Sequence, residues 1–158
     1  MEEYTITKAV DADAEDILAI QKTAYLIEAE RYNDFNLPPL RQTLEELRTD
    51  IGAQTVLKAA DSGGAIIGSV RGRADGGTCF VARLSVRPDR QNRGIATALM
   101  LELEKHFPQC SRFELFTGHR SEKNLHLYAK LGYKPFKTVP ESDNIQLVFL
   151  EKIVVRAD

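Results

Sequence analysis

The stretch from Phe80 to Phe107 constrains the fold most, because it predicts a strand, a loop and a helix in direct succession. Alternation over residues 80–86 predicts a strand, and Pro88 ends its pairing. Its two predicted faces are Phe80, Ala82, Leu84 and Val86 on one side and Val81, Arg83 and Ser85 on the other. Apolar residues then recur every fourth position and predict a helix over residues 94–107, with Ile95, Leu99, Leu103 and Phe107 on its buried face.

The loop between this strand and this helix is suited to binding phosphate. Amide N–H groups at a helix N-terminus lack intrahelical acceptors and carry a partial positive charge. Gly94 has no Cβ that would keep a ligand away from them. Arg87, Arg90 and Arg93 add positive charge to the same loop. The segment therefore predicts a cradle for a compound with several phosphates.

The composition is that of a globular protein, with 43% hydrophobic and 28% charged residues in 158. We expect one domain over residues 1–158. No apolar run approaches the ~18 residues of a membrane span, and the acidic start of the chain lacks the apolar core of a signal peptide, so we expect a cytoplasmic protein without a membrane partner. Cys79 and Cys110 are expected to be reduced and buried, and the cysteines and histidines show no metal-ligand spacing.

The net charge of −2 is unevenly distributed. Residues 71–93 hold six arginines against two aspartates, a local charge of +4 that leaves −6 for the rest of the chain. We interpret Arg71 and Arg73 as a solvated strand edge and assign the loop arginines to a phosphate ligand. Nucleic-acid binding is disfavoured, because the rest of the chain is acidic and the arginines are not interleaved with aromatic residues.

The remaining patterns predict a mixed α/β fold of about seven strands with flanking helices. Asp13 is expected to cap a first helix that ends near Arg31 and buries Ile17, Ile20, Ala24 and Ile27. A loop over residues 33–40 and a short helix over residues 43–48 follow. Further strands are predicted at 4–10, 55–60, 65–73, 113–117, 134–139 and 145–154, and a helix at 121–131 that Gly132 ends.

Two segments carry a resemblance to the GCN5-related N-acetyltransferase family. Gln91-x-x-Gly94-x-Ala96 resembles its central signature, Gln/Arg-x-x-Gly-x-Gly/Ala. The segment Leu127-Tyr128-Ala129-Lys130-Leu131-Gly132-Tyr133, about 30 residues further on, resembles its second motif, Leu-Tyr-x-Lys-x-Gly-Phe. The resemblance implies a centrally splayed sheet and an N-acetyltransferase that transfers an acetyl group from acetyl-CoA to a primary amine of a small molecule or peptide, by direct attack in a ternary complex.

The resemblance also implies roles for individual residues. The backbone of Leu84, Ser85 and Val86 would pair with the pantetheine arm, and the Val86 amide would polarise the thioester carbonyl. The cofactor-binding loop would comprise Arg90, Gln91, Asn92, Arg93, Gly94, Ile95, Ala96 and Thr97. Tyr128 would protonate the leaving thiolate, although its spacing with Leu125 and Ala129 also fits a core aromatic residue.

The chain departs from the family pattern at two places. Ser121 stands where the family commonly has a cofactor-binding asparagine, and Asn124 lies three residues later; we consider both as cofactor contacts and Ser121 also as a helix N-cap. The strand before the loop carries Arg83 and Ser85 where many relatives have a glutamate base. The candidates for acceptor binding or deprotonation are therefore Glu28, Glu30, Asp34, Glu114 and His119, beside a water relay.

The identity of the acceptor and the presence of catalysis remain separate questions. Residues 28–50 hold six carboxylates against three arginines, which favours cationic amines. The alternative to an enzyme is a non-catalytic acyl-CoA-binding or regulatory module, which would have no need of Tyr128 as an acid. We also consider a homodimer.

Overall fold

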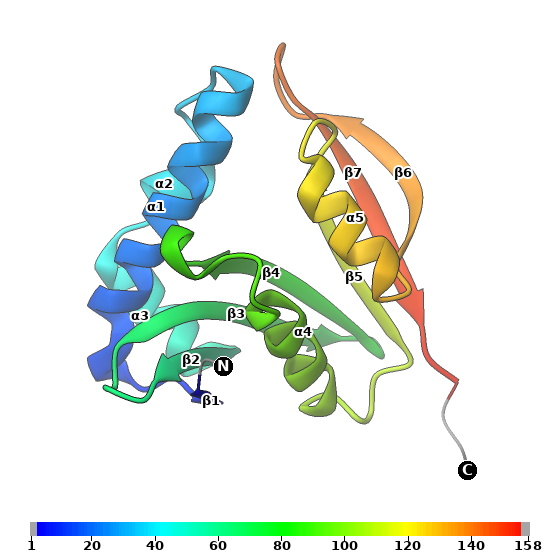
Figure 1. The fold of residues 1–158 in the computed structure, drawn as a ribbon. Coiled ribbons are helices and arrows are strands. Elements are labelled where there is room, and N and C mark those ends of the chain that lie inside the picture. Colours follow the sequence, from blue (N-terminus) through cyan, green and yellow to red (C-terminus); the bar gives the residue numbers. More distant parts are fainter. Residues whose placement is uncertain (1–2, 156–158) are drawn as a thin grey trace.

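Seven strands form one sheet in the order β1-β2-β3-β4-β5-β7-β6. The structure is a computed structural model and describes residues 3–155 (Figure 1). The strands are β1 (Tyr4–Lys8), β2 (Thr55–Asp61), β3 (Ile66–Asp75), β4 (Thr78–Val86), β5 (Arg112–Gly118), β6 (Lys134–Pro140) and β7 (Gln146–Ile153). Among the described strands, β4 and β5 are the one parallel pair. The predicted mixed sheet is confirmed.

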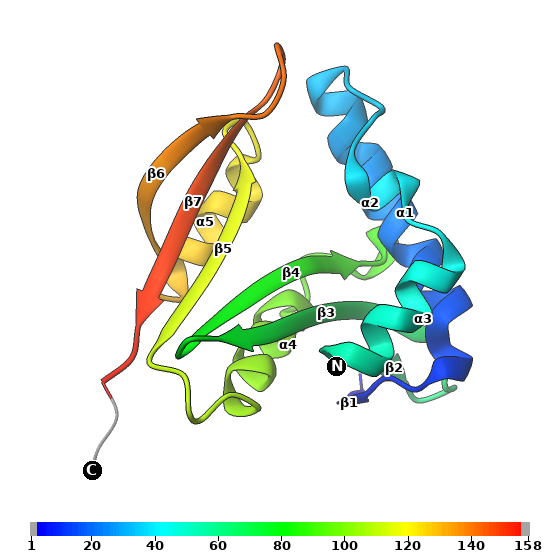
Figure 2. The same cartoon turned by 180° about the vertical axis from the view of Figure 1, so that it is seen from behind.

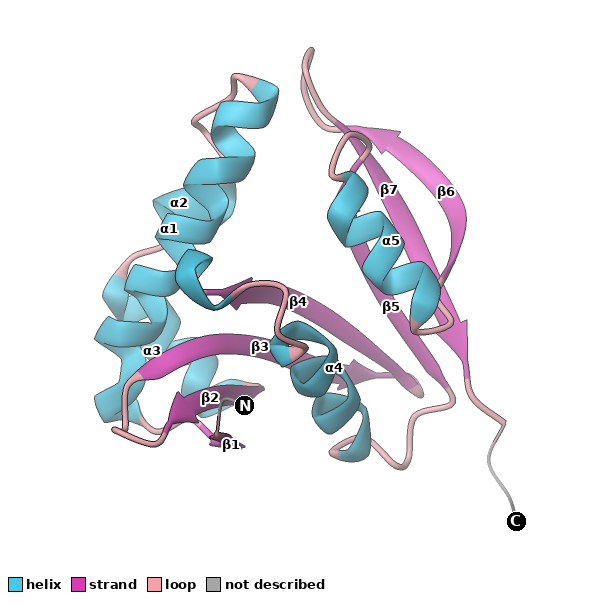
Figure 3. Cartoon of the chain, viewed as in Figure 1, coloured by secondary structure: helices cyan, strands magenta, loops and turns pink. Residues whose placement is uncertain are grey.

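Helices cover both faces of the sheet. They are α1 (Ala14–Tyr32), α2 (Pro38–Arg41), α3 (Leu44–Ala53), α4 (Ile95–Lys105) and α5 (Glu122–Lys130). Successive residues of a strand point to opposite faces, so Val56 and Ile66 pack against α1 and α3, whereas Leu57 and Ile67 belong to the core that α4 covers. Figure 2 shows α3 in front of the strands, and Figure 3 shows α4 in front of them from the other side.

The sheet opens in its centre. Strands β4 and β5 are paired only over residues 78–80 and 112–114. Beyond these residues the two strands diverge toward their C-terminal ends (Figure 1). The predicted splay is confirmed, and it leaves the C-terminal ends of these two parallel strands unpaired with each other, at the edge where ligands of open α/β sheets usually bind.

A β-bulge interrupts β4. The pairing with β3 shifts register between Ser69 and Arg71. As a result, Arg83 and Leu84 together face the single residue Val70, and the backbone of Arg83 is left-handed with a φ of 60°.

The bulge makes the predicted faces of this strand wrong. Strict alternation places Val81 and Val86 on opposite faces, yet both are buried in the core that α4 covers. The extra residue moves every side chain after it to the other face. The bulge thus leaves Arg83 on the α3 side, where it lines a cavity.

Helix α1 also differs from its prediction. Ile17 and Ile20 are buried, but Ile27 is 40% exposed, because the C-terminal half of the helix extends past the sheet (Figure 1). Asp13 precedes α1 but makes no capping bond, since its backbone is already helical; its carboxylate accepts from the Val10 amide and from Lys58, both at 2.8 Å.

Three smaller features complete the comparison with the sequence. Part of the predicted loop over residues 33–40 is the short helix α2, which Pro38 favours as its first residue. Helix α3 extends to Ala53, five residues beyond its predicted end. Cys79 and Cys110 are buried thiols, as predicted, and burial raises the pKa of the Cys79 thiol to about 12. Within residues 3–155, no helix is both long and apolar enough to cross a membrane.

Candidate active site

Three adjoining cavities lie along the splay between β4 and β5. The loop cavity, of about 430 Å³, is bordered by the end of β4, the β4–α4 loop and α5. The central cavity, of about 190 Å³, lies between α1, β4, β5 and α5. The arginine cavity, of about 720 Å³, lies between α3 and the strands β3, β4, β5 and β7. The loop and central cavities share Tyr25, Glu28 and Asn124, and the central and arginine cavities share Val81, Ala82, Arg83 and Phe116.

The loop cavity has the geometry of a phosphate cradle. Gly94 immediately precedes α4 in a left-handed conformation with a φ of 81°. A Cβ at this position would meet no atom within 4 Å, so the space above the glycine is open. The first hydrogen bond of the helix is donated by Ala98 to the Gly94 carbonyl, which leaves the amides of residues 95–97 directed toward this space. A polyphosphate fits these residues.

Most predicted cofactor-binding residues line the loop cavity. They are Leu84, Ser85, Val86, Arg90, Gln91, Asn92, Gly94, Ile95, Ala96, Thr97 and Asn124. Arg93 is exposed and is not among the lining residues. Arg90 lines the cavity while it pairs with Asp61 at 3.3 Å. Three further cations line the same cavity from α1 and α5: Arg31 and Lys123, which no sequence pattern indicated, and Lys130, which belongs to the second motif.

The backbone of Val86 points into the splay. Hydrogen-bonded and non-hydrogen-bonded pairs alternate in an antiparallel ladder. The Arg87 amide donates to the Ile67 carbonyl at 2.9 Å, so the next pair, Gly68 and Val86, is not hydrogen-bonded. The Val86 amide and carbonyl therefore face away from β3, and the Gln91 side-chain amide lies 3.5 Å from that carbonyl.

Ser121 occupies the predicted N-cap position of α5, but its hydroxyl makes no capping bond. The hydroxyl instead donates to Glu28 at 2.8 Å and lies 2.7 Å from the Tyr32 hydroxyl, which accepts from the Arg120 amide at 2.8 Å. Ser121 is buried beside the central cavity and does not border the loop cavity.

Tyr128 combines the two properties that its sequence context left open. It is buried in the core, with its ring centroid 6.1 Å from that of Tyr133, and it also borders the central cavity. Burial raises the pKa of its hydroxyl, and the charges of Tyr25 and Glu28 act in the same direction. The hydroxyl therefore stays protonated over the ordinary pH range and is available as a proton donor.

Only some of the carboxylate candidates lie near the splay. Glu28 borders both the loop and the central cavity and accepts from Arg31 at 2.7 Å. Glu114 borders the arginine cavity, 2.8 Å from Arg112. Glu30, Asp34 and His119 line none of the three cavities. The His119 ring accepts the Gln146 amide at 3.0 Å, which ties it to β7.

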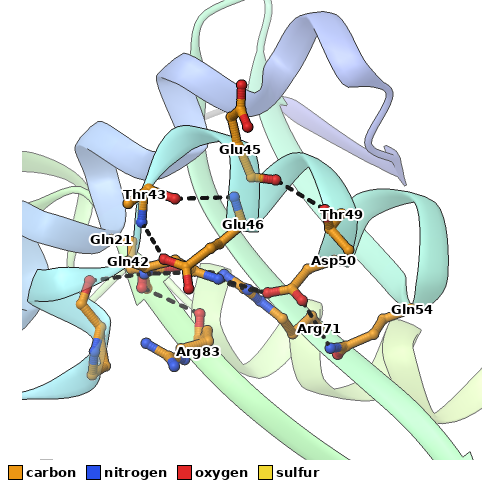
Figure 4. Close-up of polar contacts among 12 residues, drawn as sticks. Gln21, Gln42, Thr43, Glu45, Glu46, Thr49, Asp50, Gln54, Arg71 and Arg83 are labelled. Carbon is orange, nitrogen blue, oxygen red and sulfur yellow. Dashed lines mark hydrogen bonds and ion pairs between the residues drawn. The ribbon is translucent and has the colours of Figure 1, made fainter.

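The prediction of a solvated Arg71 is wrong. Its side chain is only 4% exposed, because helices α1, α2 and α3 cover this part of β3. The guanidinium donates to Asp50 at 2.6 Å and also to Gln21 and Gln42 (Figure 4). Gln42 in turn donates to Asp50 at 2.7 Å. This buried network joins the three helices to the sheet beside the arginine cavity.

The family model of the acetyltransferase (GNAT) family matches residues 15–133, a range that includes both motif segments and most of the cavity lining. The chain belongs to the GNAT family. The resemblance seen in the sequence is thereby confirmed.

Solved GNAT structures share the fold over nearly the whole chain. PaiA N-acetyltransferase of Thermoplasma acidophilum, in complex with coenzyme A, has a TM-score of 0.80 at 18% identity and covers 96% of this chain and 99% of its own. YncA of Salmonella typhimurium, with acetyl-CoA, has a TM-score of 0.75 at 19% identity and covers 99% and 96%. At these identities the GNAT structures show the fold of the chain.

The matches to curated relatives cover only part of those proteins. The UPF0157 protein YqkA of Bacillus subtilis is 24% identical over 134 residues, which are 85% of this chain and 38% of YqkA. An acetyltransferase of Yersinia enterocolitica is 34% identical over 82 residues, which are 51% of this chain and 58% of that protein. The chain thus spans about two fifths to three fifths of the length of these relatives.

Proposed function

We propose that the protein is an N-acetyltransferase that transfers an acetyl group from acetyl-CoA to a primary amine in a ternary complex. The observation that carries this proposal is the junction of the loop and central cavities at Tyr25, Glu28 and Asn124. A donor bound in the first cavity and an acceptor bound in the second would meet there. The coenzyme A and acetyl-CoA bound to PaiA and YncA support the choice of donor.

The chain supplies a holder for each part of the donor. The open amides at the start of α4 would hold the pyrophosphate, with Lys123 and Lys130 beside them. The unpaired edge of β4 would run along the pantetheine arm. The Val86 amide, which faces the splay, would donate to the thioester oxygen as negative charge develops on it.

Glu28 at the junction and Tyr128 in the central cavity would move the protons. Acetyl-CoA supplies a thioester, whose C–S bond breaks as the amine nitrogen forms the new C–N bond. Glu28 would take a proton from the amine, directly or through water, and Tyr128 would give its proton to the departing sulfur. A non-catalytic module would bind the donor without any thiol release, so turnover distinguishes the two functions.

Gly94→Asp tests the cradle. The new carboxylate would lie in the open space above the amides, and repulsion from the pyrophosphate should weaken acetyl-CoA about 100-fold in calorimetric titration. Gly77→Asp is the matched control, because Gly77 has the same φ of 81° and the same open surroundings in the β3–β4 turn. Both variants should lose similar stability, roughly 1–2 kcal/mol for the left-handed backbone.

The two glycine variants also define the result that would contradict the phosphate cradle. Equal acetyl-CoA affinities of folded Gly94→Asp and Gly77→Asp would remove the cradle from the loop. Acetyl-CoA binding by the unmodified protein, without thiol release across a broad panel of amines, would favour the binding module over the enzyme.

A further inference from the structure

The arginine cavity is lined by equal numbers of basic and acidic side chains. Every acidic side chain has a hydrogen-bond or ion-pair partner within the chain, whereas among the residues that the structure describes not every basic one does. Its charged lining consists of Arg71, Arg73 and Arg83 with Glu46, Asp50 and Glu114. Asp50 accepts from Arg71 at 2.6 Å, Glu46 accepts from the Thr43 amide at 2.9 Å, and Glu114 lies 2.8 Å from Arg112. The carboxylates of this cavity therefore have partners within the chain.

Arg83 differs from these carboxylates. Its Nη1 is buried and makes no hydrogen bond to any described residue. A buried donor on a charged group costs free energy when it has no acceptor, so native structures rarely keep one without a function. The bulge holds the side chain in this place, at a left-handed backbone position that arginine seldom adopts.

Arg71 adds to the positive potential. Burial lowers its pKa to about 10, and the nearby charge of Arg83 acts in the same direction. Its Nε is a second buried donor without a partner among the described residues. Figure 4 shows Arg83 beside the network that Arg71 and Asp50 form. An anion against Arg83 would reduce the repulsion between the two guanidinium groups and satisfy a buried donor.

We propose that the acetyl acceptor carries a carboxylate beside its amine and that Arg83 binds this carboxylate. The inference rests on the proposed acetyltransferase function. Arg83 borders both the arginine cavity and the central cavity, where Glu28 and Tyr128 lie, so one small molecule can reach both sites. The acceptor class is a free amino acid. This acceptor differs from the cationic amine that the sequence favoured, because the carboxylates that line the arginine cavity already bond to other groups of the chain.

Measuring thiol release with matched pairs of acceptors tests the role of the acceptor carboxylate. The probes are the common L-amino acids and β-alanine, each compared with its own carboxamide at saturating acetyl-CoA. We expect kcat/KM for the best amino acid to exceed that of its amide by roughly 30- to 1000-fold, the range for an unmet buried charge. In Arg83→Gln this preference should disappear through a loss with the amino acid, while turnover of the amide changes little. Arg73→Gln is the control on the exposed rim of the same cavity and should change kcat/KM by less than about fivefold.

A second measurement covers acceptors that bind without turnover. Amino acids should raise the melting temperature of the complex with coenzyme A, and the amides and Arg83→Gln should not show the shift. Equal use of amides and acids would overturn the inference, as would the absence of both carboxylate-dependent turnover and carboxylate-dependent stabilisation. The proposed acetyltransferase function would be contradicted by a different result, the absence of thiol release with every amine. Turnover of the amides alone would contradict the role of the carboxylate but not the acetyltransferase function.

Discussion

At the scale of one residue, Tyr128 is both a core side chain and the proton donor that we propose. It is buried against Tyr133 and borders the central cavity. Tyr128→Phe keeps the ring and its packing but removes the proton. We expect kcat to fall about 10- to 1000-fold, with unchanged acetyl-CoA affinity in calorimetry and an unchanged melting temperature.

Tyr133→Phe is the matched control for this prediction. Tyr133 is equally aromatic and buried, but its hydroxyl donates to Glu104 at 3.0 Å. Its replacement should cost about 0.5–1.5 kcal/mol of stability and leave turnover unchanged. If Tyr128→Phe behaves in the same way, Tyr128 is a structural residue and another group protonates the sulfur.

Glu28 is the second residue whose role can be tested singly. Glu28→Gln keeps an acceptor for the Ser121 hydroxyl but removes the base. We expect kcat/KM to fall about 10- to 100-fold at neutral pH and the deficit to shrink as pH approaches the amine pKa of about 10, because the amine then loses its proton unaided. Glu30→Gln, outside all three cavities, should behave as the unmodified protein does. A deficit that is constant with pH would assign Glu28 to positioning.

At the scale of elements, β4 and α3 build the site together. The bulge in β4 turns Arg83 toward α3 and leaves the Val86 amide free at the splay. Helix α3 begins with a capping box in which Thr43 and Glu46 bond each other's amides at 3.2 and 2.9 Å. One turn later the same helix presents Asp50 to Arg71. The capped helix thus places Arg71 in a hydrogen-bonded network, and the bulge leaves Arg83 open to the proposed ligand.

At the scale of the whole molecule, hydrogen-bonded carboxylates make stability depend on pH. Burial alone would raise the pKa of Asp13, but the hydrogen bonds from Lys58 and the Val10 amide outweigh it and lower that pKa. The pKa of Asp61 is also lowered, first by the Ala65 amide. A carboxyl whose folded pKa lies below its unfolded value near 4 stabilises the fold above that pH, and this stabilisation is lost as pH falls through the folded pKa.

Urea denaturation checks this sign. The unfolding midpoint should fall as pH drops below the unfolded value near 4, and Asp13→Asn should be less stable than the unmodified protein at pH 7, with a difference that shrinks as pH falls through the folded pKa. A stability difference that stays constant as pH falls would show that packing around Asp13, and not its charge, is responsible.

The sequence by itself determined the order of the elements, the strand–loop–helix cradle around Gly94 and the family. These rest on local causes: side-chain periodicity, glycine and proline positions, and short-range motifs. It did not determine the bulge, since one extra residue in a ladder is defined only by the partner strand. The predicted exposure of Arg71 is also wrong, because helices α1 and α3, which are distant from it in the sequence, bury it. The neighbourhood of Glu28, Arg83 and Tyr128 exists only after the sheet has splayed, so tertiary structure alone decided which charges share a cavity.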